Sequence, residues 1–460
     1  MTDTDTDISY RPVHRLTPLL KLWTLIVALI AAVLLNLNAG ALASIGAFMR
    51  GDNALMPILI AVGGLVGLSV LVWLVSYIWW RAMGYRLDEE KVAYRQGVIS
   101  KRERTARYDR IEAVDVVEPF IARLFRVAAV RVETAGGKGS VIEIAYLNRA
   151  EASQLRSEIL AHRRGTPAET PGETQDEQPE RTEAVVDEIP IGRSLAASAL
   201  SSATPAAVIV LGIVALTPIP FATIIPILIG VVPAIWKIID RSWRFRAHLV
   251  DDGETLDLNY GLASRRRQTV PLQRIHAVSI HQPVLWRLTG WWQVQVSVAG
   301  YGASPESSNS GSTTILPVGT REQAVHLAAI VGPLSRQEIE TAARPEGHTQ
   351  PTFTSPKRAF WVSPIDRDQQ SVTFLDDTAI THRGRLARTV NFIAMSHIQE
   401  LTFRRGLLNH LCNLADVRFD LVAGPVRMAG RDLSVDDGYE LLGRLRQRSL
   451  PKMQPVEAEL

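Results

Sequence analysis

Cysteine is almost absent from the chain, which has one, Cys412, among 460 residues. A single cysteine excludes a disulfide within the chain and is typical of soluble parts that lie in a reducing compartment. Enzyme signatures are absent as well: there is no phosphate-binding loop, no dinucleotide glycine fingerprint and no helical His-Glu-x-x-His motif. His410 stands near Cys412, but no second ligand pair follows at zinc spacing. We therefore predict a protein that is not an enzyme and has no catalytic residues, no metal and no cofactor.

Charged residues are missing from the interiors of four long apolar stretches, 22–37, 54–80, 195–216 and 221–239. About 20 helical residues cross the hydrocarbon core of a bilayer, so each neighbouring pair of stretches predicts a hairpin of two transmembrane helices. Aromatic residues close the second stretch, as is typical of a membrane interface. The missing interior charges argue against a transporter or a proton relay. The aromatic residues are Trp73, Tyr77, Trp79 and Trp80.

Charge is spread unevenly along a chain whose net charge is +3. Gly165–Pro190 holds eight acidic residues and one basic residue, which predicts a disordered linker. The remainder is basic, which favours an anionic membrane surface over nucleic acid as a partner. By the positive-inside rule, both termini and all soluble domains are predicted to lie in the cytoplasm, on a multi-pass inner-membrane protein. The flanking basic residues are Arg11, Arg15, Lys21, Arg81, Arg86, Lys237, Arg241, Arg244 and Arg246.

A long segment of the chain occurs twice with identical internal spacing and a third time in fainter form. A repeat of this length specifies one structural unit that is used three times. The third copy has a histidine and a glycine, His397 and Gly406, in place of the motif's arginine and proline. The structural positions are Gly97, Arg110, Pro119 and Gly136 in repeat 1, Gly261, Arg274, Pro283 and Gly300 in repeat 2, and Gly384 and Gly424 in repeat 3.

Within each repeat, short runs of alternating apolar and polar residues predict β-strands, and the glycines predict the turns between them. One amphipathic helix follows in each, with Asn148, Thr320 and Ser434 as predicted N-caps. Several strands and one helix predict a small antiparallel barrel or sandwich, in which the helix closes one open end. The second repeat carries an insertion, which is placed in a loop around 301–313 because the strands and the helix keep their spacing.

Paired apolar stretches followed by the pattern Gly…Arg-Ile…Val…Pro…Arg-Leu…Val-x-Val…Ala-Gly resemble the bacterial pleckstrin-homology-like (PH-like), or membrane-flanking, domain. Three such units with two helical hairpins are similar to the YdbT type of that family. The resemblance implies a multidomain membrane protein with four transmembrane α-helices and three PH-like β-barrel or sandwich domains, each capped by a C-terminal helix. It implies no known reaction or ligand. The predicted segments are a cytoplasmic tail (1–18), transmembrane hairpin 1 (19–82), PH-like domain 1 (83–163), an acidic linker (164–192), transmembrane hairpin 2 (193–240), PH-like domain 2 (241–333), a linker with a basic-aromatic segment (334–366), PH-like domain 3 (367–449) and a C-terminal tail (450–460).

Basic residues follow the first turn glycine of every repeat and are the first candidates for binding. One interpretation is contact with anionic lipid headgroups, where each basic residue near the surface contributes about 1 kcal/mol. The alternative is a solvated strand face. Recurrence in three repeats supports the lipid interpretation. The residues are Lys101, Arg102, Arg104, Arg107, Arg265, Arg266, Arg267, Arg385 and Arg388.

Two further features each have a functional and a structural interpretation. Arg110 and Arg274 suit bidentate phosphate binding, or else a hydrogen bond that ties a strand to a neighbouring turn. Lys357–Trp361 is a basic-aromatic segment that suits the membrane interface, or else a plain linker.

Aromatic residues of repeat 2 form a third candidate, as an interfacial foot or a partner-binding patch. Successive strand residues point to opposite faces, so one of Trp291 and Trp292 is predicted to lie in the core. The aromatic set is Trp286, Trp291, Trp292 and Tyr301.

We expect a non-enzymatic integral membrane protein that holds three cytoplasmic PH-like domains against the bilayer, where they bind anionic lipid headgroups or protein partners. Family analogy extends this expectation to cell-envelope maintenance or stress tolerance. The alternative is an oligomeric channel or a transport accessory. Gly63 and Gly67 have the spacing of close helix packing in a homo-oligomer. A membrane enzyme has no motif to support it.

Overall fold

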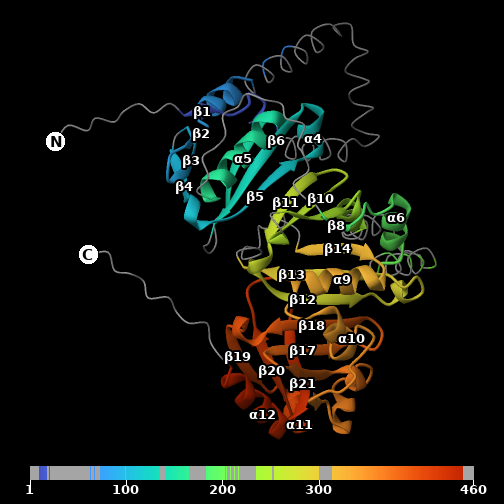
Figure 1. Ribbon diagram of the computed structural model, residues 1–460. Coiled ribbons are helices and arrows are strands. Elements are labelled where there is room, and N and C mark those ends of the chain that lie inside the picture. The colour runs from blue at the N-terminus through green and yellow to red at the C-terminus, as the bar shows by residue number, and fades with distance from the viewer. Residues whose placement is uncertain are drawn as a thin grey trace, which may run out of the picture. The chain divides into compact units, whose positions relative to one another are not determined.

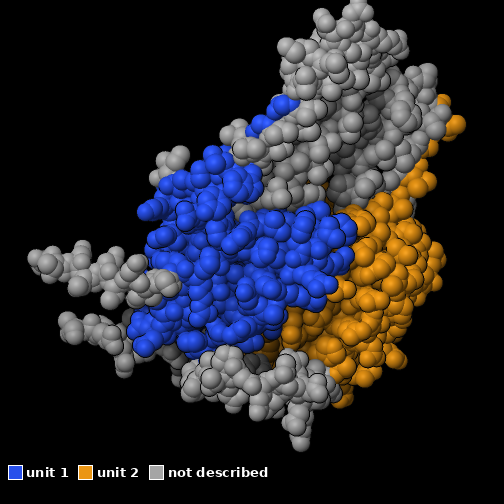
Figure 2. All heavy atoms as spheres, turned by 90° about the horizontal axis from the view of Figure 1, so that it is seen from above, with its two compact units in different colours: residues 1–135, 140–171 blue, residues 136–139, 172–460 orange. Residues whose placement is uncertain are grey.

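The computed structural model describes residues 10–17, 20, 63, 67, 73–98, 100–134, 141–164, 183–201, 204, 208, 212, 216, 235–250, 253–299 and 313–448. The chain divides into two compact units (Figure 2). Unit 1 comprises residues 1–135 and 140–171 and contains repeat 1. Unit 2 comprises residues 136–139 and 172–460 and contains repeats 2 and 3.

The prediction of four transmembrane helices is wrong for the part of the chain that the structure describes. No helix there is long and apolar enough to cross a membrane, since a span needs about 20 consecutive helical residues. The predicted stretch 22–37 lies outside the described residues, as do most residues of 54–80, 195–216 and 221–239.

Unit 1 is built from two antiparallel sheets and one long helix (Figure 1). Its elements are β1 (Arg11–Pro12), β2 (Gly84–Leu87), β3 (Lys91–Gln96), β4 (Arg102–Arg107), the 3-10 helix η1 (Tyr108–Arg110), β5 (Ile111–Glu118), α4 (Phe120–Leu124), β6 (Val127–Thr134), β7 (Val141–Asn148) and α5 (Arg149–Arg164). Strands β1, β2, β3 and β4 pair in that order, and β6 pairs with β5 and β7. Helix α5 lies across the sheet that contains β5, β6 and β7 (Figure 1).

Helix α5 begins where the sequence predicts. A carboxylate oxygen of Glu151 accepts a hydrogen bond from the backbone N of Asn148 at 3.2 Å, which places Asn148 at the N-terminus. Ala152, Leu155 and Ile159 are buried in the core that the two sheets share. These positions are three or four residues apart, so they form one apolar stripe that faces the sheets.

Unit 2 contains the same order of elements twice. Each copy has four strands, a 3-10 turn, three further strands with a short helical turn after the first of them, and a closing helix, and other short helices lie between these elements. Its elements are β8 (Glu183–Val186), α6 (Ile191–Ala199), β9 (Arg246–Val250), β10 (Thr255–Tyr260), β11 (Arg265–Pro271), η4 (Leu272–Arg274), β12 (Ile275–Gln282), η5 (Leu285–Arg287), β13 (Trp292–Val298), β14 (Thr314–Gly319), α9 (Arg321–Val331), α10 (Arg336–Thr341), β15 (Phe353–Thr354), η7 (Lys357–Trp361), η8 (Arg367–Gln369), β16 (Ser371–Leu375), β17 (Thr378–Arg383), β18 (Arg388–Ala394), η9 (Met395–His397), β19 (Glu400–Arg404), α11 (Leu407–Leu411), β20 (Leu414–Asp420), β21 (Met428–Ser434) and α12 (Val435–Arg446). The predicted N-caps Thr320 and Ser434 are confirmed, because their side chains accept hydrogen bonds from the backbone N of Gln323 and Asp437.

One continuous sheet joins repeats 2 and 3. Strand β12 pairs antiparallel with β18, from Ala277 opposite Ile393 to Gln282 opposite Arg388. The sheet has seven strands in the order β14-β13-β12-β18-β17-β16-β15 (Figure 1). An uncovered edge strand presents unpaired backbone groups, and here each repeat covers an edge of the other. The described parts of repeats 2 and 3 are therefore one hydrogen-bonded body.

A glycine occupies the same hairpin turn in all three repeats. Gly97, Gly261 and Gly384 have φ values of 109°, 118° and 84°, in a region that glycine adopts readily and other residues do not. A Cβ at these positions would lie 2.1, 2.0 and 1.9 Å from the carbonyl oxygen three residues later. The turns join β3 to β4, β10 to β11 and β17 to β18, so they set the position of the basic strand in each repeat.

Replacing Gly261 with alanine is expected to lower the free energy of unfolding by about 2 kcal/mol, because the new Cβ collides with the backbone at an unfavourable φ. Chemical denaturation of the full chain measures this loss. Gly253→Ala is the matched control, since Gly253 has a φ of 92° but no atom within 4 Å of a built Cβ. Equal effects of the two substitutions would show that the collision contributes nothing.

The end of the predicted acidic linker is ordered, which corrects the prediction for these residues. Glu183–Val186 forms β8, which pairs with β9, and α6 follows it. Val186 and Ile189 are buried. The segment is acidic on average. Burial of its last apolar side chains nevertheless stabilises a strand at its end. Residues 165–182 lie outside the described part of the chain.

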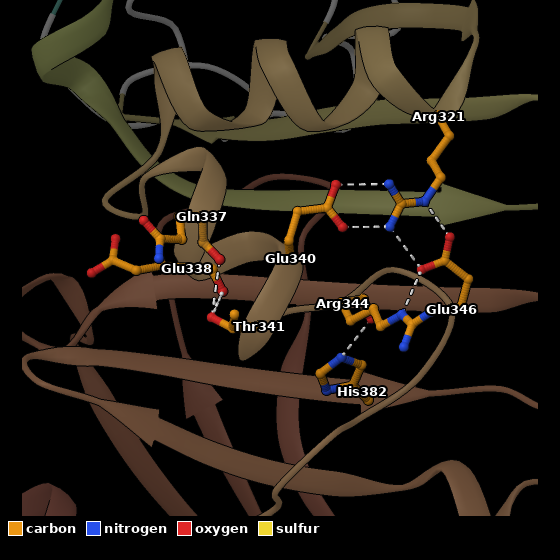
Figure 3. Close-up of polar contacts among 8 residues, drawn as sticks. All are labelled: Arg321, Gln337, Glu338, Glu340, Thr341, Arg344, Glu346 and His382. Atoms are coloured by element: carbon orange, nitrogen blue, oxygen red, sulfur yellow. Dashed lines mark hydrogen bonds and ion pairs between the residues drawn. The ribbon is translucent and has the colours of Figure 1, made fainter.

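Ion pairs hold the connection between repeats 2 and 3 (Figure 3). The guanidinium group of Arg321, on α9, donates to both carboxylate oxygens of Glu340 at 2.7 and 2.6 Å and also pairs with Glu346. The hydrogen bonds from Arg321 hold the pKa of Glu340 below its usual value. The carbonyl of Arg344 accepts a hydrogen bond from Nε2 of His382 on β17 at 3.1 Å. The predicted linker between the repeats is thus bound to both of them.

Two histidines of this body are held in the neutral form. Burial lowers the pKa of His382 to about 4. Burial, together with the nearby Arg383, lowers the pKa of His281 to about 4 as well. An unfolded histidine titrates near pH 6.5, so between about pH 6.5 and pH 4 the unfolded chain binds more protons than the folded chain. Stability is therefore expected to fall as the pH drops through this window.

At pH 5 each of these histidines is expected to lower the free energy of unfolding by about 2 kcal/mol relative to pH 7.5. The measurement is the thermal midpoint of the full chain across this pH range. His382→Gln keeps an amide donor for the Arg344 carbonyl and removes the titrating ring, so it should flatten the pH dependence. His326→Gln, at an exposed position on α9, should leave the dependence unchanged. An unchanged slope for His382→Gln would contradict the assignment.

Candidate membrane-surface site

The basic strand of repeat 1, β4, lies on the surface. The Nη1 group of Arg104 donates to the carbonyl of Val141 at 3.1 Å, and Arg107 pairs with Asp109 at 3.2 Å. Exposed contacts of this kind hold side chains only weakly, and the strand presents its basic residues to solvent. The exposed residues are Lys101, Arg102, Arg104 and Arg107.

In repeat 2 a carboxylate fixes the turn that precedes the basic strand. Oδ1 of Asp240, near the end of the helical residues 235–242, accepts hydrogen bonds from the backbone N of Leu262, Ala263 and Ser264. The three distances are 2.9, 2.6 and 3.3 Å. Hydrogen bonds to an ionised acceptor are stronger than neutral ones, so β11 starts at a fixed position beside the helix end.

The helix end and the start of β11, which Asp240 ties together, carry four basic residues that we call the basic cluster, namely Lys237, Arg241, Arg265 and Arg266. Lys237 and Arg241 are one helical turn apart and therefore share a face. Burial lowers the pKa of Arg241, and the nearby Arg266 lowers it further. Arg265 is exposed. Neighbouring positive charges repel one another. An anion that binds between them reduces this repulsion and is itself stabilised.

Acidic residues neutralise the basic residues around this cluster. Arg267, one of the predicted binding residues, pairs with the buried Asp257 at 3.1 Å. Glu188 pairs with Arg244 at 3.5 Å and also with Arg246. The hydrogen bond from Arg246 lowers the pKa of Glu188. These pairs give Arg267, Arg244 and Arg246 a structural role.

The basic residues of repeat 3 lie at its junction with repeat 2. The Nη1 group of Arg287 donates to the carbonyls of Arg385 and Leu386 at 3.1 and 3.4 Å. Arg388 stands opposite Gln282 in the pairing of β12 with β18. Burial lowers the pKa of Arg388, and Arg287 adds to this effect. The backbone of this copy of the basic motif therefore contacts repeat 2.

The first residue of the Arg-Ile motif, which is a histidine in repeat 3, ends a one-turn 3-10 helix in each repeat. The helices η1, η4 and η9 end at Arg110, Arg274 and His397. The carbonyl of Arg274 accepts a hydrogen bond from the backbone N of Ala299 at 2.9 Å. The backbone of the motif therefore has a structural role in repeat 2. The next residue is a buried isoleucine in every case, namely Ile111, Ile275 and Ile398.

Gly424 marks a close approach between repeats 2 and 3. A Cβ built on it would lie 2.3 Å from Oγ of Ser297, so a larger residue would force the two repeats apart at this point. Ser297 Oγ also accepts a hydrogen bond from the backbone N of Val426 at 3.3 Å. The predicted motif positions Gly136 and Gly300, and Tyr301 in the predicted insertion, lie outside the described residues.

The tryptophans of repeat 2 serve mainly in packing. Trp292, on β13, is buried, which confirms that one of the two adjacent tryptophans lies in the core. Trp286 is buried as well, and its Nε1 donates to the carbonyl of Ala197 on α6 at 3.0 Å. Its ring meets that of Trp291 edge to face. The interfacial interpretation is therefore wrong for Trp286.

Exposed leucines that the sequence analysis missed occur at one position of all three repeats. They lie in α4, directly after η5, and in α11, the short elements that follow Pro119, Pro283 and Gly406. A leucine at a recurring repeat position usually predicts the core, and no periodic signal in the sequence indicates otherwise. The leucines are Leu124, Leu288 and Leu411, which are 72%, 82% and 74% exposed.

Among the described residues, no group of three or more His, Cys, Asp or Glu side chains is placed to hold a metal ion. Cys412 is half-buried at the end of α11, and His410 is exposed on the same helix.

Residues 22–163 and 197–333 match the bacterial PH domain family. The chain therefore belongs to this family, as the repeat motif predicted. A curated protein with which it shares further similarity is the UPF0699 transmembrane protein YdbT of Bacillus subtilis (strain 168), at 23% identity over 283 residues. The match covers 55% of this chain and 57% of the relative, so it spans little more than half of that protein's length. No solved structure matches the chain. Repeat 3 lies beyond the family match, yet it has the same element order as repeats 1 and 2.

Asp240→Ala is expected to lower the free energy of unfolding by about 1–2 kcal/mol, because three backbone donors lose a charged acceptor. Amide exchange at Leu262, Ala263 and Ser264 should become faster, and mass spectrometry of the full chain measures it. Asp240→Asn keeps a carbonyl oxygen at the same place and should recover part of both effects. Unchanged exchange in Asp240→Ala would contradict the role of this carboxylate.

Proposed function

We propose that this chain is a non-enzymatic, membrane-associated protein whose PH domains bind anionic lipid headgroups on the cytoplasmic side of the membrane. The name of the Bacillus subtilis relative, a transmembrane protein, supports association with a membrane. PH domains commonly bind lipids or proteins, and the family match makes either class a candidate. The observation that carries the proposal is the basic cluster, held in place by the hydrogen bonds from Leu262, Ala263 and Ser264 to Asp240.

The size of the expected attraction follows from the number of charges. Each basic residue near an anionic leaflet contributes about 1 kcal/mol, so the four residues of the basic cluster contribute about 4 kcal/mol. Binding to a mobile loop would cost conformational entropy, because the loop must become ordered. The turn is already held in place, so this cost is smaller here. Arginines also bind phosphate or carboxylate oxygens with two parallel hydrogen bonds. The interaction is expected to weaken with salt, since surface charges are screened within about 10 Å at 0.1 M ionic strength.

A probe beside the basic cluster tests the proposal on the full chain. In a Cys412→Ser background, Ser264→Cys provides a single labelling site for an environment-sensitive fluorophore. Vesicles of phosphatidylcholine with phosphatidylglycerol should shift the emission to shorter wavelength, and vesicles of phosphatidylcholine alone should not. Arg265→Gln combined with Lys237→Gln should remove about 2 kcal/mol of attraction, which is a roughly thirtyfold weaker response to anionic lipid.

Arg336→Gln is the matched control, because it removes an exposed charge from α10 of the same unit. It should leave the response almost unchanged. An equal emission spectrum in neutral and anionic vesicles would sink the lipid proposal. A shift that depends on protein concentration rather than on lipid charge would instead identify a second copy of the chain as the partner.

A further inference from the structure

The exposed leucines belong to a recurring surface feature that neither the basic cluster nor the fold explains. We call this feature the apolar tip and define it as residues 120–125, 284–289 and 407–412. In each repeat it follows the first strand of the second sheet, namely β5, β12 or β19. A residue with positive φ ends each tip, and it is Arg126, Gly290 or Asn413, with φ of 55°, 70° and 51°.

Each apolar tip combines one buried anchor with exposed apolar side chains. The anchor is Ala122, Trp286 or Asn409, all of which are buried. The exposed leucine stands two residues later in every copy. The first tip position is also apolar and exposed in all three copies, and the residues are Phe120, Val284 and Leu407. The same two positions of the apolar tip therefore expose apolar side chains to solvent in all three copies.

In repeat 3 a second segment joins the tip. The guanidinium group of Arg358, in η7, donates to the carbonyl of Asn413 at 3.1 Å, which ties η7 to the end of α11. Phe360 and Trp361 of η7 are 51% and 78% exposed. Leu407, Leu408 and Leu411 on α11 are 81%, 57% and 74% exposed. Figure 1 shows α11 at the edge of the repeat. The basic-aromatic segment and the missed leucines thus lie on two exposed segments that this hydrogen bond ties together, and we call the two segments the apolar patch.

Basic residues precede the apolar residues of both segments of this patch in the sequence. Arg405 is anchored by hydrogen bonds to the carbonyl of Leu414 at 3.1 Å and to Oδ1 of Asn413 at 3.3 Å. Apolar side chains surrounded by lysine and arginine are the composition of segments that lie in the interfacial layer of a bilayer, with the charges at the level of the headgroups. The exposed basic residues are Lys357, Arg358, Arg404 and Arg405.

The geometry points to insertion of the apolar tip of repeat 3, together with η7, into the interfacial layer of a bilayer that contains anionic lipid. This inference rests on the proposed function and names a second point of lipid contact. The variation among the three tips favours lipid over a protein partner. Their first residue is phenylalanine, valine or leucine. All three side chains are apolar, but they differ in size and shape. A protein interface requires complementary shape, whereas a bilayer requires apolar area and compatible charge.

The native cysteine makes the test direct. Cys412 is the only cysteine of the chain and follows α11, so a fluorophore attached to it in the full chain reports on the tip. With vesicles of phosphatidylcholine and phosphatidylglycerol, lipids that carry a quencher in their acyl chains should quench the label. Leu407→Ser and Leu411→Ser should each raise the lipid concentration for half-maximal quenching about tenfold. Trp361→Ser should act in the same direction.

Leu386→Ser is the matched control, because Leu386 is an exposed leucine of the same repeat outside the tip. It should leave the quenching curve unchanged, and equal thermal midpoints show that all variants fold. A label that remains unquenched overturns the inference. If the probe at position 264 still responds to anionic lipid, the proposed function survives that result; if neither probe responds, both fail. Shielding of the label that requires no lipid and grows with protein concentration would identify a second copy as the occupant and also overturn the inference.

Discussion

The pairing of β12 with β18 is the interaction on which the architecture of unit 2 depends. A PH-like sheet is small, and an edge strand that stays uncovered exposes backbone groups. Here the edges of two repeats satisfy each other, and the side chains along the seam fit closely. A Cβ on Gly332 would lie 2.6 Å from the ring of Phe392 and 3.2 Å from Val278. The rings of His276 and His397 stack beside the seam at 4.3 Å between centroids. The two repeats therefore act as one rigid support for the surfaces that they present.

This joining explains why copies of one motif have different roles. In repeat 2 the strand after the turn glycine contributes Arg265 and Arg266 to a cluster that Asp240 holds in place. In repeat 3 the corresponding turn receives the guanidinium group of Arg287 and serves the junction. Corresponding basic residues thus have different surroundings in the two copies, because the contacts of a charged side chain depend on its folded neighbours and not on its motif. All three repeats expose an apolar tip, and the tip of repeat 3 includes Leu411.

Local features were predictable from the sequence, and features that depend on distant residues were not. The N-caps Thr320 and Ser434 follow from short-range hydrogen bonding, and the burial of Trp292 follows from strand alternation. Composition misled in two places. Acidic content concealed β8, whose few apolar residues gain burial only when β9 lies beside them. Hydropathy predicted four transmembrane helices, which the described residues do not contain. No sequence pattern predicted that Leu411 is exposed, because a single leucine occurs both in cores and on surfaces.

The sequence by itself determined the repeat, the order of strands and helices within it, the turn glycines and the family. These depend on backbone preferences and on periodicities that a few neighbouring residues carry. The tertiary structure decided which sheet edges pair, which arginines are neutralised and which leucines face the solvent. Those outcomes depend on residues far apart in the chain, such as Asp240 with Ala263 or Arg358 with Asn413. A side chain's burial and its charge partners are properties of the folded neighbourhood, so they exist only once distant segments have come together.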